Sequence, residues 1–92
     1  KRINENFSDI IAAIEKILFA SLEQRLVGFL LDEAAGEEDG KIYMTQEQIA
    51  KAIGSAREAV GRTLKVLVKD GCVKLFRGGV QVINRKELYK KI

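Results

Sequence analysis

Three charged residues in one short segment, Arg57, Glu58 and Arg62, are the clearest candidates for chemistry in this sequence. At 100° per residue along an α-helix they lie within about 140° of one another, so they share one polar stripe. An arginine fork matches the O6 and N7 acceptors of guanine, and a carboxylate can accept a hydrogen bond from cytosine N4. The pattern therefore predicts hydrogen bonding to base-pair edges in a major groove, which is wide enough for one helix.

Glu58 has more than one interpretation. A carboxylate close to phosphates is unfavourable unless it accepts a specific hydrogen bond, which favours base reading. Glu58 also follows Ser55 by three residues, as in a capping box, and precedes Arg62 by four, as in a helical ion pair. The sequence leaves these interpretations open.

Other residues complete the same helix. Lys65 shares the polar stripe and is predicted to contact the DNA backbone. Gly61 costs about 1 kcal/mol relative to Ala inside a helix, which indicates that something approaches the backbone closely there. The opposite face carries the apolar side chains that would anchor the helix, namely Ala56, Val60, Leu64 and Leu67.

The residue types also argue against several classes of function. The chain has no His and one Cys, so it cannot supply an imidazole base or a zinc cluster of the usual spacing. Cys72 lies in an apolar alternation and is predicted to be a buried small thiol. No carboxylates are paired on a predicted apolar pocket, and no apolar run approaches the roughly 20 residues of a membrane span. We predict no enzymatic activity, no metal, no cofactor in this chain and no membrane contact.

The net charge of +3 is distributed unevenly over the 92 residues. Residues 1–44 hold five Lys and Arg against nine Asp and Glu, which gives −4, whereas residues 45–92 hold eleven against four, which gives +7. The second half is therefore a candidate surface for a polyanion, and the acidic half should face away from it.

Two predicted helices position the polar stripe. Thr45 and Ser55 are each followed three residues later by Gln or Glu, which is the capping-box pattern. We predict one helix over residues 45–52, ended by Gly54, and a second over 55–69, ended by an Asp-Gly pair. Two helices joined by a short turn containing Gly form a helix-turn-helix, with the second as the recognition helix.

The segments around these helices complete a winged fold. Two β-rich runs, residues 72–76 and 80–83, flank a Gly-Gly turn and predict a two-stranded wing. A short apolar run at 42–44 is a candidate edge strand, and Asn84 is predicted to cap a final turn that holds Leu88 against the body. The predicted fold class is α+β, mainly helical: a winged helix-turn-helix preceded by part of a dimerisation helix.

Apolar residues in the first 20 positions are spaced 4, 3, 4 and 3 apart, which is the heptad pattern of a coiled coil. The alternative is a helix packed on its own domain, since two further apolar residues widen the stripe. The predicted dimer seam consists of Ile3, Phe7, Ile10, Ile14 and Ile17.

A second helix is predicted to begin at Ser21, with Gln24 completing a capping box, and to end near Ala34. We therefore divide the chain into residues 1–20, the end of a coiled-coil-like dimerisation helix, and residues 21–92, a winged helix-turn-helix DNA-binding domain.

The recognition segment resembles that of the cAMP receptor protein and FNR (Crp-Fnr) superfamily of bacterial transcription regulators. Residues 22–26 resemble the first helix of that family's DNA-binding domain, and residues 45–49 resemble its pre-recognition helix. The residues that carry the resemblance are Gly54, Ser55, Ala56, Arg57, Glu58, Ala59, Val60, Gly61 and Arg62, followed by Leu64, Lys65 and Leu67.

The resemblance implies roles by position: Arg57, Glu58 and Arg62 would read bases in a palindrome of TGTGA-like half-sites, and Thr45 would contact phosphate. The family often has Ser where this chain has Ala56, so no hydroxyl contact is expected there. Residues 3–19 would end the helix leading from an effector-sensing β-barrel that this chain does not contain. The implied partners are double-stranded DNA, a second copy of the chain and, for the full-length regulator, RNA polymerase. Nothing in the sequence resembles a secretory signal, so a cytoplasmic protein is predicted.

The sequence as a whole thus predicts specific binding to double-stranded DNA by the output domain of a transcription regulator. The alternative is a winged helix used for protein contacts, with the basic stripe facing an acidic partner. The residues assigned to the DNA backbone are Thr45, Gln46, Ser55, Lys65 and Arg77.

Overall fold

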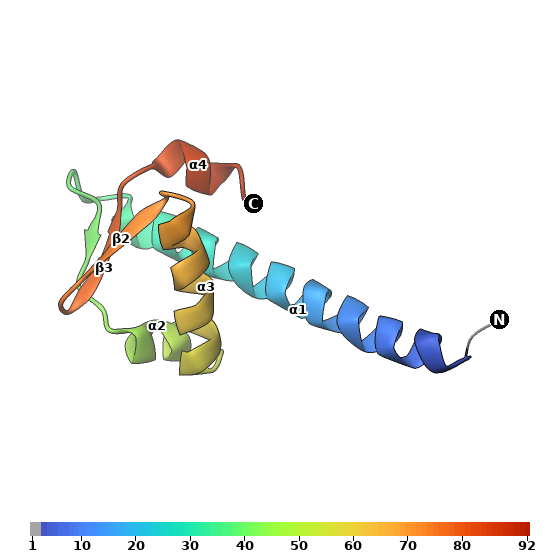
Figure 1. Ribbon diagram of the computed structural model, residues 1–92. Helices are drawn as coiled ribbons and strands as arrows, with labels where there is room; N and C mark the ends of the chain where they lie inside the picture. The colour runs from blue at the N-terminus through green and yellow to red at the C-terminus, as the bar shows by residue number, and fades with distance from the viewer. Residues whose placement is uncertain (1–2) are drawn as a thin grey trace.

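A long helix projects from a small domain, which the described residues build from three further helices and a three-stranded sheet at one side (Figure 1). The computed structural model describes the backbone of residues 3–92 and the side chains of residues 9–92. The elements are α1 (Ile3–Ala34), β1 (Lys41–Ile42), α2 (Gln46–Ile53), α3 (Arg57–Lys69), β2 (Val73–Phe76), β3 (Gly79–Val82) and α4 (Arg85–Tyr89). The mainly helical α+β class and the winged helix-turn-helix are confirmed.

Helix α1 is continuous over 32 residues, so the prediction of a second helix beginning at Ser21 is wrong. The first 27 residues of the chain contain neither Gly nor Pro, and nothing else in the sequence interrupts helical hydrogen bonding there. Ser21 is exposed on the helix surface, where a polar side chain is tolerated without capping anything. The predicted end at Ala34 is confirmed, and the Arg85 guanidinium donates to the Ala34 carbonyl oxygen at 2.7 Å.

The hydrophobic core lies where the second half of α1 meets α3 and the sheet. Among the described side chains of α1, the buried ones all lie in this half, and the rest of the helix extends beyond the domain (Figure 1). Cys72 is buried as predicted, and so is Leu88 of α4. The fully buried apolar side chains of the two main helices are Leu26, Val27, Leu30 and Ala34 of α1 and Val60, Leu64 and Leu67 of α3.

The predicted capping box at the start of α2 is confirmed. The Gln48 backbone N–H donates to Thr45 Oγ1 at 3.1 Å, and the Thr45 N–H donates to Gln48 Oε1 at 2.9 Å. The helix ends, as predicted, at Gly54, whose φ of 69° is left-handed. The Ser55 N–H then donates to the Ala50 carbonyl oxygen at 2.9 Å, which completes a Schellman motif.

The predicted capping box of Ser55 and Glu58 is wrong. Ala56 is the N-cap of α3 and makes no side-chain capping bond, so the helix covers Arg57–Lys69 rather than residues 55–69. The physical reason is that the Ser55 backbone closes the preceding helix and leaves the next residue to open α3. Ala56 is exposed at this junction and does not belong to the buried face of α3.

The sheet has the antiparallel order β1-β3-β2, so the predicted two-stranded wing gains a third strand along its edge. The edge strand predicted at residues 42–44 pairs instead over Lys41–Ile42, with Ile42 opposite Val80. At the turn of the wing, Gly79 leaves no room for a side chain, because the Ile42 carbonyl oxygen and the Phe76 ring occupy that space. A glycine is therefore required where β1 pairs beside the turn of the hairpin.

Candidate nucleic-acid interface

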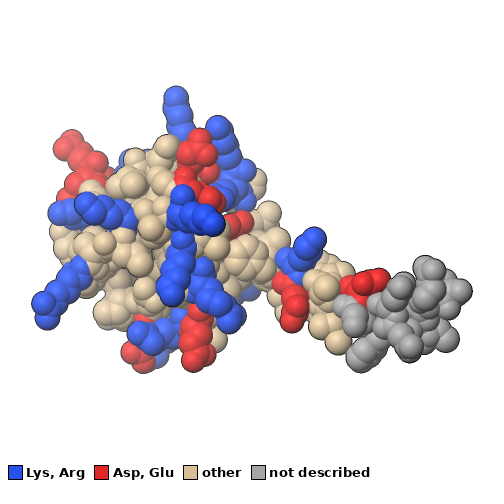
Figure 2. Space-filling model, viewed as in Figure 1, with Lys and Arg blue, Asp and Glu red and all other residues tan. Residues whose placement is uncertain are grey.

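Helix α3 presents one polar face to solvent and one apolar face to the core. Arg57, Glu58, Arg62 and Lys65 are all exposed, as the predicted stripe requires. On the buried side, the Thr63 hydroxyl donates to the Ala59 carbonyl oxygen at 2.9 Å, so this polar group is satisfied within the helix. Lys and Arg side chains gather over α3 with acidic side chains among them, as Figure 2 shows.

The structure narrows the interpretation of Glu58. Among the described side chains it makes neither a capping contact with Ser55 nor an ion pair with Arg62. Its carboxylate projects from the first turn of α3, next to Arg57 in the chain. Of the three interpretations that the sequence left open, the capping box with Ser55 and the ion pair with Arg62 are absent. The Glu58 carboxylate is therefore available to a ligand.

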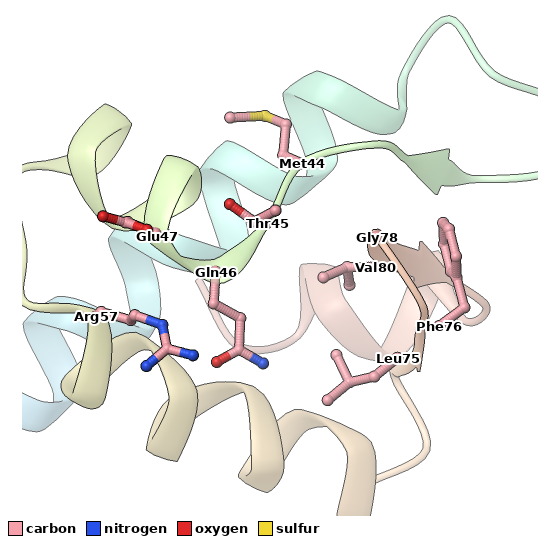
Figure 3. Close-up of a pocket in the computed structure, with 10 residues that line it drawn as sticks. Met44, Thr45, Gln46, Glu47, Arg57, Leu75, Phe76, Gly78 and Val80 are labelled. Atoms are coloured by element: carbon pink, nitrogen blue, oxygen red, sulfur yellow. The ribbon is translucent and has the colours of Figure 1, made fainter.

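A hollow of about 390 Å³ separates the first turns of α2 and α3 from the wing. Thr45 and Gln46 line it from α2, Arg57 from α3, and Phe76 and Gly78 from the wing. Figure 3 shows the Arg57 guanidinium and the Gln46 amide directed into the space between the two helices. The hollow was not predicted, since it brings together three segments far apart in the sequence and no local pattern indicates it.

Two of the five predicted backbone contacts line this hollow, and the other three do not. Thr45 and Gln46 line it, whereas Arg77 is exposed at the turn of the wing and Lys65 is exposed further along α3. Ser55 is half-buried, with its backbone N–H engaged by the end of α2. The three predicted base readers do not share one hollow either. Arg57 lines the hollow beside the wing, whereas Arg62 lines a second groove between α3 and α1, beside Leu18, Phe19 and Leu22.

The close approach predicted at Gly61 has an internal explanation. A Cβ atom added to Gly61 would lie 3.0 Å from Oε1 of Gln46. The group nearest this glycine is therefore the side chain of a residue in α2. Sequence reasoning interpreted the glycine correctly as a close approach but could not name the neighbour, because the contact joins two helices.

The predicted dimer seam is exposed where its side chains are described. Ile10, Ile14 and Ile17 expose 55%, 50% and 66% of their surface, so they do not pack on their own domain. Ile3 and Phe7 lie outside the residues whose side chains are described. For residues 9–20, the part of this segment whose side chains are described, the alternative of a helix packed on its own domain is therefore wrong.

Two groups with shifted pKa values, Cys72 and Lys91, lie near the end of α3, away from the hollow. Burial raises the pKa of the Cys72 thiol, which favours its protonated form. The hydrogen bond that Lys91 donates to Asp70 at 2.7 Å raises the pKa of Lys91. This contact ties the chain end to the residue that closes α3, so both groups have structural explanations.

The arrangement of α2, a tight turn, an exposed recognition helix and an antiparallel wing defines a winged helix-turn-helix domain. The family model of the Crp-like helix-turn-helix domain matches residues 24–91. This chain therefore belongs to the Crp-like helix-turn-helix family, and it is a DNA-binding domain of the transcription regulators in the Crp-Fnr group.

Known proteins of this kind resemble the chain along most of its length. The transcriptional regulator SdrP of Thermus thermophilus is 27% identical over 94 residues, which cover 96% of this chain and 46% of SdrP. The probable transcriptional regulator flp of Lacticaseibacillus casei is 31% identical over 70 residues, which cover 74% of this chain and 32% of flp. The solved structure of the CO-sensing protein from R. rubrum superposes with a TM-score of 0.83 at 29% identity, over 94% of this chain and 43% of that protein. The chain spans less than half the length of each of these relatives.

Other kinds of site find no support in the part of the chain that the structure describes. None of its helices has the length and apolar character needed to cross a membrane. The described residues also contain no group of three or more potential metal ligands.

Proposed function

We propose that this chain binds a specific sequence of double-stranded DNA by placing α3 in the major groove, as the output domain of a transcription regulator. The observation that carries the proposal is the stripe of Arg57, Glu58 and Arg62, exposed on a helix whose opposite face is fully buried. A helix anchored in this way holds its polar side chains in fixed positions, which hydrogen bonding to base edges demands.

Each polar side chain has a role in this proposal. Arg57 donates to guanine O6 and N7, Glu58 accepts from cytosine N4, and Arg62 contacts a neighbouring base pair. A carboxylate without an internal partner supports sequence reading, since a binder of DNA in general would gain affinity by losing it. The residues that hold the sugar-phosphate backbone in the proposal are Thr45, Gln46, Ser55, Lys65 and Arg77.

The proposed assembly is a homodimer on a palindrome with TGTGA-like half-sites. The exposed row of Ile10, Ile14 and Ile17 supplies the seam along α1, and two recognition helices would enter successive major grooves about one helical turn apart. Residues 1–20 would then form the dimerisation segment and residues 21–92 the DNA-binding domain of a longer cytoplasmic regulator. RNA polymerase is a further proposed partner of that full-length protein.

Selection of preferred DNA from a random pool tests specificity, half-site and spacing together. Arg57→Ala should weaken binding to the selected site by about 1–3 kcal/mol and flatten the preference at one base pair. Lys65→Ala is the control: it should weaken all sequences alike and reduce the slope of log K against log salt by about 0.9. If Arg57→Ala leaves the sequence preference unchanged, direct readout by α3 is wrong.

The same measurements separate DNA binding from the alternative of a protein-interaction module. A module of that kind should bind random DNA weakly and without a steep dependence on salt. A steep salt dependence together with a selected consensus would exclude it.

A further inference from the structure

Gly61 leaves a gap in the reading surface of α3, and a side chain from another helix fills it. Counting 100° per residue, Gly61 lies about 40° from Arg57 and about 40° from Lys65, between them on the exposed stripe. A side chain at position 61 would therefore project from the surface proposed to face the bases. The 3.0 Å between Gln46 Oε1 and the Cβ position of Gly61 places the Gln46 amide where that side chain would be.

The start of α2 fixes the backbone from which the Gln46 side chain extends. Gln46 is the first residue of α2, directly after Thr45, whose capping box with Gln48 fixes the first turn of the helix. Its side chain is half-buried against α3 and lines the same hollow as Arg57 (Figure 3). The amide thus comes from α2, yet it lies on the surface that α3 presents.

The chemistry of the amide selects a ligand. A glutamine side chain offers one acceptor and two donor hydrogens, which pair with N6 and N7 of adenine in the major groove. A phosphate would use only the donors, and the exposed lysines and arginines beside the stripe are better placed by charge for that contact. From this geometry we infer that Gln46 is a specificity-determining residue that reads an adenine next to the guanine read by Arg57. The inference rests on the proposed function and moves Gln46 from the backbone contacts to the base readers.

Selection from a random pool with the unsubstituted chain and with Gln46→Ala tests the inference. The unsubstituted chain should prefer adenine at one position of each half-site, beside the position that Arg57→Ala flattens. Gln46→Ala should lose that preference and weaken binding to the selected site about 5- to 150-fold, while other positions keep their preferences. Gln24→Ala, which removes an exposed glutamine from α1, is the matched control and should change neither.

Gly61→Ala provides a second variant that leaves Gln46 in the sequence. The added methyl group would lie 3.0 Å from Gln46 Oε1, so the amide would have to shift by a few tenths of an ångström and the preference for adenine should weaken. The double variant Gln46→Ala, Gly61→Ala should bind no more weakly than Gln46→Ala alone. A further loss in the double variant would mean that the methyl group meets the DNA itself, which contradicts the placement of the amide.

The outcomes distinguish this inference from the proposal on which it rests. If the unsubstituted chain selects no sequence, specific DNA binding itself is wrong. If Arg57→Ala flattens one position while Gln46→Ala flattens none, only the role of Gln46 is wrong. A Gln46→Ala variant that weakens all sequences equally would return Gln46 to the backbone contacts.

Discussion

The Thr45 hydroxyl has a structural role in the capping box and a proposed role against phosphate, and substitutions at this position can separate the two. Thr45→Ala removes the hydrogen bond that the Gln48 N–H donates to Oγ1 at 3.1 Å and leaves that N–H to water at the exposed start of α2. Loss of such a cap costs about 1 kcal/mol. For a domain of this size, that corresponds to a fall of about 4–8 °C in Tm.

Thr45→Asp is expected to act differently on stability and on DNA binding. Aspartate is a good N-cap, and its charge interacts favourably with the N-terminus of α2, so the free energy of unfolding should be kept or raised. The same charge would repel a phosphate, so affinity for DNA should fall further than in Thr45→Ala. Because salt screens this repulsion, the difference between the two variants should shrink as the salt concentration rises.

Urea denaturation measures the first quantity, and fluorescence anisotropy with a labelled duplex at several salt concentrations measures the second. Thr45→Ser keeps a hydroxyl in the same place and should resemble the unsubstituted chain in both assays. If Thr45→Asp binds DNA as tightly as the unsubstituted chain, Thr45 does not face phosphate. If Thr45→Ala is as stable as the unsubstituted chain, the cap contributes nothing.

Two further predictions concern the support of α3. Leu64→Ala should lower the free energy of unfolding by about 2–5 kcal/mol, since the side chain is fully buried. Val68→Ala, at a site 40% exposed, should lower it by well under half of that amount. Equal losses of the two variants in urea denaturation would contradict the burial of one face of α3. Asp70→Asn should cost less than about 1 kcal/mol near pH 7, because the contact with Lys91 is partly exposed. The folded pKa of Lys91 is raised, so this contribution is fully present below the ordinary value of 10.5 and is lost as pH rises through the raised value. Unfolding measured from neutral to alkaline pH should therefore show the Asn variant converging on the unsubstituted chain, and a difference independent of pH would refute the pairing.

Local rules of sequence predicted the parts of the fold whose causes are local. The cap at Thr45 and the end at Gly54 follow from hydrogen bonds within a few residues, and both are present. The capping box predicted at Ser55 is absent because the Ser55 backbone N–H donates to the Ala50 carbonyl oxygen at the end of the preceding helix. The Ser21 pattern failed for the opposite reason, since nothing had ended the helix before it and a cap needs a free helix start.

The polar stripe was predictable because it depends on helical periodicity alone. The hollow was not, since it needs the packing of α2 and α3 and the position of the wing. A close approach at Gly61 was predictable, because a glycine destabilises a helix and needs a reason to be there. Its neighbour Gln46 was not predictable, since it is fifteen positions away and belongs to no recognisable pattern. The bounds of the edge strand were predicted wrongly because a pairing of two residues leaves almost no trace in composition.

The unbroken helix α1 fixes an angle between two surfaces of the molecule. Ile17 of the exposed row and Leu26 of the core are nine residues apart, which places them about 180° from one another around the helix axis. One inserted residue between them would swing the row by about 100° relative to the domain, whereas seven would move it by only about 20°. In a dimer joined along that row, the number of residues between Ile17 and Leu26 would therefore set the direction in which each recognition helix points.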